Sequence, residues 1–141
     1  MERDYHELHY DTLRRDLDMD DSRALALQAL AKSNDDLYFE IGSAVSGKAA
    51  LPRSTKELIG TGVEWFNLKR EGIALTVCGS KSLREFARQD VPTHELVVAI
   101  SGILDLSSHA LGGPPVVTVA VLIVRLGLHQ FCSKVWESKP I

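Results

Sequence analysis

One stretch of nine residues constrains the fold of this chain more than any other. Residues 116–124 read VVTVAVLIV, and Thr118 is the only polar residue among them. A helix with this sequence is apolar on every face, so protein or lipid must surround it completely. A membrane span needs about 20 apolar residues, and Arg125 follows this run directly. The sequence therefore predicts a helix buried at the centre of a protein core.

The preceding segment supplies a packing partner for this helix. Apolar side chains recur at a helical period over residues 96–104, and this segment opens at Pro92 and Thr93. The sequence GGPP at 112–115 then interrupts the helical pattern. We expect an antiparallel helical hairpin over residues 94–132, in which the second helix ends at Cys132.

Helix-capping signals mark further helices before this hairpin. Ser54 and Glu57 form a capping box at the start of a long apolar stripe that ends near Gly79, and Ser80 or Ser82 begins a short helix. These segments predict an all-α fold, a compact bundle of six or seven helices around the central hairpin.

The predicted bundle is a single domain over residues 1–141, with an arm at one end and a tail at the other. Residues 1–40 carry a net charge of −6, whereas residues 41–141 carry +3. The acidic arm, residues 1–20, is either a solvated helix or a cover for a basic surface. The tail comprises residues 133–141.

A small α/β domain is the alternative fold. Four short apolar runs would be its buried strands, and β-branched residues dominate the last of them; the runs are 37–41, 73–77, 96–100 and 116–124. The gap from Asp105 to Gly113 is too short for a helical crossover between parallel strands. The helical period also continues through Ser101 and Gly102, which favours the all-α fold.

Residues 42–48 match a phosphate-binding loop up to its last position. Gly42 is followed by four residues, Gly47 and Lys48, but Ala49 stands where a Ser or Thr would hold Mg²⁺. Pro52 also cuts short the helix that should follow. The favoured interpretation is that Gly47 ends a helix and Lys48 complements its negative end. Nucleotide binding by a degenerate loop at 42–48 remains an alternative function.

No other residues combine into a catalytic or metal site. His6 and His9 share a helix face, but no third metal ligand accompanies them. Asp105, Ser108 and His109 are neighbours on one predicted helix, where three near-parallel side chains do not form a triad. We therefore predict no catalytic residue, no metal and no cofactor.

Cysteine and charge content suggest a cellular location and argue against nucleic acid as a partner. Cys78 and Cys132 are too few for a disulfide scaffold and too far apart for a zinc knuckle. The first ten residues carry charges where a signal peptide would be apolar. We expect a cytoplasmic protein with reduced, mostly buried thiols. Lys and Arg are dispersed, so no nucleic-acid binding is expected.

Aromatic residues suggest how the protein acts. Trp65 and Phe66 are adjacent and cannot both face one core, while Val135 and Trp136 lie in the predicted tail. Exposed aromatics commonly anchor interfaces, although Trp136 could instead fold back over the domain. We expect a non-enzymatic interaction or regulatory protein that binds itself or another protein through these residues. The alternative from a different class is a membrane-active effector that uses the apolar hairpin 96–131.

Overall fold

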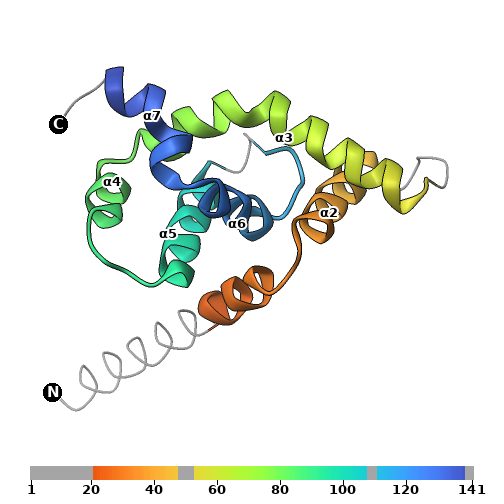
Figure 1. The fold of residues 1–141 in the computed structure, drawn as a ribbon, viewed down its shortest axis with the longest axis horizontal. Helices are drawn as coiled ribbons and strands as arrows, with labels where there is room; N and C mark the ends of the chain where they lie inside the picture. Colours follow the sequence, from red (N-terminus) through yellow and green to blue (C-terminus); the bar gives the residue numbers. More distant parts are fainter. Residues whose placement is uncertain (1–20, 48–52, 108–110, 139–141) are drawn as a thin grey trace, which may run out of the picture.

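The computed structural model describes residues 21–47, 53–107 and 111–138, and these residues form helices without any strand (Figure 1). The all-α fold predicted from the sequence is confirmed, and the α/β alternative is wrong. A helix over residues 21–30 precedes six further helices. These are α2 (Asn34–Ser46), α3 (Thr55–Cys78), α4 (Lys81–Ala87), α5 (Thr93–Leu106), α6 (Val116–Leu126) and α7 (Leu128–Ser138).

Local sequence signals account for where these helices begin. Ser33, Ser54 and Ser80 each accept a hydrogen bond from the backbone N–H three residues later, which satisfies a donor that the helix itself leaves free. Helices α5 and α6 instead begin directly after Pro92 and Pro115. Proline is suited to these positions because its fixed φ matches a helix start and it lacks the N–H that would be unsatisfied.

Helix α6 forms the centre of the core, as its sequence predicts. Six consecutive residues, from Thr118 to Ile123, are buried, so neighbouring elements cover the helix on all sides. Helix α5 contributes Val97, Ile100 and Leu104, which are fully buried. The Thr118 hydroxyl donates to a Glu40 carboxylate oxygen at 2.8 Å, which satisfies the one polar side chain of this apolar segment.

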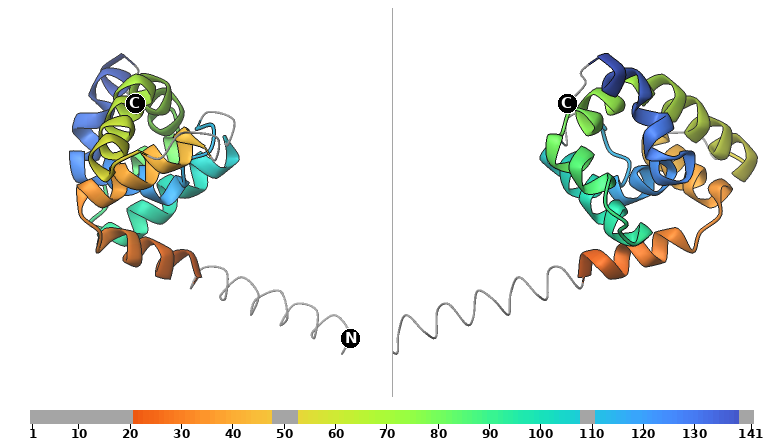
Figure 2. Two further views of the ribbon diagram at one scale, coloured as in Figure 1. Left: turned by 90° about the vertical axis from the view of Figure 1, so that its right-hand side faces the viewer. Right: turned by 60° about the vertical axis from the view of Figure 1, so that its left-hand side comes forward.

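The helix over residues 21–30 lies along the outside of the bundle (Figure 2). Ala26 and Ala29 form its buried face. Arg125, at the end of α6, donates to the Leu30 carbonyl oxygen at 2.9 Å and to Asn34 Oδ1 at 2.7 Å. The guanidinium thus satisfies a terminal carbonyl of this helix and ties the helix to the core.

Helices α2 and α3 approach so closely that their backbones touch. A Cβ atom on Gly42 would lie 1.8 Å from the Leu58 carbonyl oxygen, and one on Gly62 would lie 2.0 Å from the Tyr38 carbonyl oxygen. No real Cβ atom tolerates such distances, so both positions require glycine. Gly42 therefore serves helix packing.

The C-terminal part of the chain differs from the prediction. The helix expected to end at Cys132 stops at Leu126, and a separate helix, α7, runs on to Ser138. Gly127 lies between them with a φ of 93°, and the two helix axes differ by 85°. The predicted start of a tail at residue 133 is wrong, because residues 133–138 belong to α7. The positive φ of Gly127, which glycine adopts easily, turns the chain between the two helices. The predicted acidic arm lies outside the described residues.

The α2–α3 contact leads to a matched pair of substitutions. Gly62→Ala should lower the free energy of unfolding by about 1–3 kcal/mol, because the methyl group must push two helix backbones apart. Gly60→Ala, in the same helix with no atom near its added Cβ, should raise it by about 0.5–1 kcal/mol. Urea unfolding followed by circular dichroism measures both, and shifts of the same sign would contradict this account of the contact.

Candidate functional site

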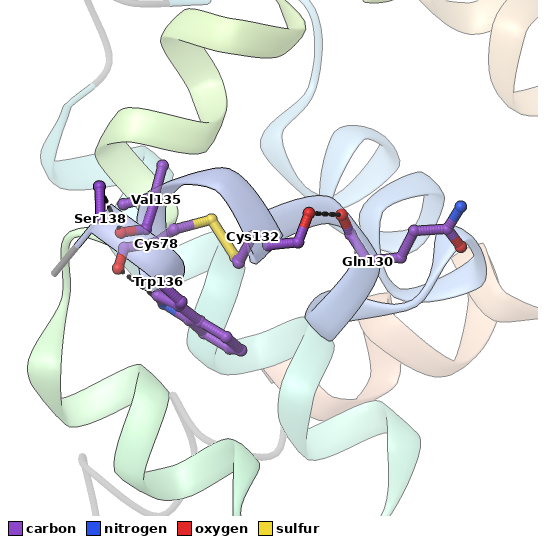
Figure 3. Close-up of a disulfide and its surroundings, with 7 residues drawn as sticks. Cys78, Gln130, Cys132, Val135, Trp136 and Ser138 are labelled. Carbon is purple, nitrogen blue, oxygen red and sulfur yellow. Dashed lines mark hydrogen bonds between the residues drawn. A yellow bond between two sulfur atoms is a disulfide. The ribbon is translucent and has the colours of Figure 1, made fainter. Parts of the chain in front are cut away.

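A disulfide joins the end of α3 to the middle of α7 (Figure 3). Cys78 and Cys132 are 54 positions apart in the sequence, and their Cα atoms are 5.4 Å apart. Closing a loop of this length stabilises the folded state by about 4 kcal/mol in the chain-entropy model. Both cysteines are buried, as expected.

The expectation that these cysteines are reduced is wrong. Sequence separation says nothing about distance in the folded chain, so the pairing of Cys78 with Cys132 had no signal in the sequence alone. Disulfides persist mainly in oxidising environments, and the pairing removes the thiol argument for a cytoplasmic location. That location stays a prediction.

Trp136 lies against this disulfide and is buried, with 8% of its surface exposed. Its Nε1 donates to the Cys78 carbonyl oxygen at 3.0 Å (Figure 3). Arg84 from α4 stacks over the indole at 5.2 Å and donates to the Trp136 carbonyl oxygen at 3.3 Å. The indole therefore folds back over the domain. Its expected role as an exposed anchor is wrong because α7 continues past Cys132 and places Trp136 one turn later on the same face.

The two residues of the other predicted aromatic pair differ in burial. Phe66 is 2% exposed and packs edge-on against Tyr38, with ring centroids 6.3 Å apart. It cannot contact a partner in this conformation, so its assignment to a binding surface is wrong. Trp65 is half-buried and packs against the core. Both side chains thus contact one core, so the prediction that they cannot both face it is wrong.

A groove of about 810 Å³ lies between α3 and α7. Leu68 and Leu75 border it from α3, and they are 83% and 67% exposed. Being seven residues apart, they lie on one face of that helix. Phe131 and Val135 line it from α7. Val135 is the one residue of the predicted partner-binding set that this groove includes.

Sequence reasoning missed Leu68 and Leu75, although a signal was present. The apolar stripe of α3 that faces the core includes Phe66, Ile73 and Val77. Leu68 and Leu75 fall outside this stripe, at the spacing of a second, weaker stripe. A helix with two apolar stripes has two faces to cover, and the described residues cover one of them.

Cations outnumber anions around the groove. Arg70 and Lys134 line it together with one acidic residue, Glu71. The Arg70 guanidinium lies over the Phe131 ring, 5.6 Å from its centroid, so it links the two walls. The groove thus combines apolar side chains with a small excess of positive charge.

The remaining candidate sites gain no support from the structure. Gly42 lies inside α2, and Gly47 ends that helix with a φ of 70°, so residues 42–47 do not form a phosphate-binding loop. Lys48 lies outside the described residues, as do His6, His9, Ser108 and His109. Within the ranges that the structure describes, no three His, Cys, Asp or Glu side chains could hold a metal together.

None of the described helices is by itself long and apolar enough to cross a bilayer. Helices α6 and α7 meet the length and composition only as a pair, with the 85° bend between them.

The indole hydrogen bond predicts a specific loss of stability. Trp136→Phe keeps an aromatic ring in place but removes the donor to the Cys78 carbonyl, so the free energy of unfolding should fall by about 1 kcal/mol. Trp65→Phe is the matched control, because the Trp65 indole makes no hydrogen bond to the described residues. Equal losses in the two variants, measured by urea unfolding, would contradict the role of this bond.

Known proteins do not suggest a function for this arrangement. Comparisons with family models, with curated proteins and with solved structures found no match. Within the described residues, the α3–α7 groove combines exposed leucines, a cavity and flanking charge.

Proposed function

We propose that this protein is a non-enzymatic interaction module that binds an amphipathic helix of a protein partner in the α3–α7 groove. The observation that carries this proposal is the exposure of Leu68 and Leu75, at 83% and 67%, beside a cavity of about 810 Å³. Large apolar side chains gathered on a concave surface are typical of protein-binding sites.

The spacing of the groove residues suits a helix as the bound element. Leu68 and Leu75 are about 10 Å apart along the axis of α3, since each helical residue advances the chain by about 1.5 Å. A partner helix lying along the groove would match them with apolar residues at positions i, i+4 and i+7. Val135, one turn along α7 from the buried Phe131, would contact the same apolar face from the other wall.

The charged residues of the groove suggest which residues lie beside the apolar stripe of that partner helix. Arg70 and Lys134 line the groove together with one acidic residue, Glu71. Acidic residues beside the apolar stripe of a partner would complement this excess of positive charge, which favours correct orientation and faster association. The proposed partner therefore presents an apolar stripe with acidic flanks.

The polar residues of the groove favour binding over catalysis. Ser133 is the one hydroxyl-bearing residue that lines it. Its Oγ donates to the Gln130 carbonyl oxygen at 3.1 Å, whereas a catalytic serine needs an adjacent base. The groove thus resembles a recognition surface more closely than a reaction centre.

Two synthetic peptides test the proposal. Both are amphipathic helices of about 18 residues with leucines at i, i+4 and i+7; one carries Glu beside the apolar stripe and the other carries Lys. The acidic peptide should bind the wild-type protein more tightly in a titration followed by fluorescence anisotropy. Leu68→Lys should weaken this binding at least tenfold, because burying a leucine contributes about 1.5–3 kcal/mol.

Leu106→Lys is the matched control for Leu68→Lys. Leu106 is 91% exposed at the end of α5 and does not line the groove, so this substitution should leave the affinity unchanged. Equal affinity of the wild-type protein for both peptides, or equal loss in both variants, would contradict the proposal. Self-association that Leu68→Lys abolishes would identify a second copy of the chain as the partner.

The membrane-active alternative, using residues 96–131, remains a separate proposal. It would require α6, whose central residues are buried, to leave the core and insert with its neighbours. Co-sedimentation with vesicles that contain anionic lipid tests this step. Failure of the protein to pellet at neutral and acidic pH would count against it.

A further inference from the structure

We propose that the Cys78–Cys132 disulfide controls the α3–α7 groove, so that oxidation holds the groove open for binding and reduction removes it. The predicted effect of reduction on binding rests on the function proposed above, whereas the predicted loss of the groove does not. Cys132 belongs to α7, the same helix that supplies one wall of the groove.

Helix α7 depends on neighbouring helices for its position, and α3 supplies its covalent link. It has 11 residues, and an isolated helix of fewer than about 12–15 residues is marginal in water. Gly127 separates it from α6 by an 85° bend, so α6 does not extend it as a continuous helix. Two bonds tie it to the end of α3: the disulfide and the hydrogen bond from Trp136 to the Cys78 carbonyl.

The groove in turn depends on α7. Five of its eleven lining residues come from this helix, among them Phe131, Val135 and Lys134. The other six come from α3, which also packs against α2. Release of α7 would therefore remove one wall and one of the two cations, and leave Leu68 and Leu75 on an open helix face.

The redox step needs a dithiol as its co-reactant. A dithiol thiolate attacks one cysteine sulfur, which forms a mixed disulfide and releases the other cysteine as a thiolate. The second thiol of the reagent then closes a cyclic disulfide and frees the first cysteine. Two electrons and two protons thus pass from the dithiol to the protein. Because Cys78 and Cys132 are 4% and 0% exposed, this attack requires α7 to open first.

Hydrogen exchange measured by mass spectrometry tests the structural step. Amides of residues 128–138 should exchange at least about tenfold faster after treatment with dithiothreitol, while those of α2 and the first half of α3 should keep their protection. A Cys78→Ala/Cys132→Ala double variant should match the reduced wild type and show no response to dithiothreitol.

Two outcomes would overturn the inference. Unchanged protection of α7 after full reduction would show that packing alone holds this helix. Loss of protection over α2, α3 and α7 together would show that the disulfide supports the whole fold instead of one helix.

Peptide binding separates failure of this inference from failure of the proposed function. If both hold, the acidic peptide binds oxidised protein and its affinity falls at least about tenfold on reduction. Equal binding in both states would refute redox control and leave the proposed function standing. No binding to oxidised protein, with α7 still released on reduction, would refute the proposed function and its redox control of binding, and confirm only the structural step.

Discussion

The requirement to surround α6 organises this molecule. Its central residues, 118–123, are buried on every side, so no single neighbour can cover it. Helix α5, which precedes the GGPP segment, packs beside it, and α2 and α7 also contact it. The hydroxyl of Thr118 finds its acceptor on Glu40 of α2, and Arg125 at the other end holds the helix over residues 21–30. Both polar contacts join the central helix to elements far away in the sequence.

Helix α3 connects this core to the proposed site. With 24 residues it is about 36 Å long, and it runs past α2 at one end and α7 at the other (Figure 1). Gly62 allows α2 to touch its backbone, and the disulfide at Cys78 secures α7. Between these two contacts, the face that carries Leu68 and Leu75 has no cover among the described residues. The groove is thus a consequence of a long helix with short neighbours.

The cluster around Cys78 stabilises the fold beside the proposed site. Trp136 and Arg84 bring α7 and α4 together beside the disulfide. The same helix that Trp136 anchors presents Phe131 and Val135 to the groove. A site that depends on a covalent bond can respond to redox conditions, whereas a site made by packing alone cannot. This difference is the physical basis of the proposed control.

The sequence by itself determined the fold class and most helix starts, because those depend on local interactions. The apolar run at 116–124 required burial, and Ser54 and Ser80 cap their own helices. Only the tertiary structure decided which distant residues meet. It paired Cys78 with Cys132, whose contact spans 54 positions, and it set Gly42 against the backbone of α3. Such contacts depend on how whole helices pack, and no local pattern encodes that packing.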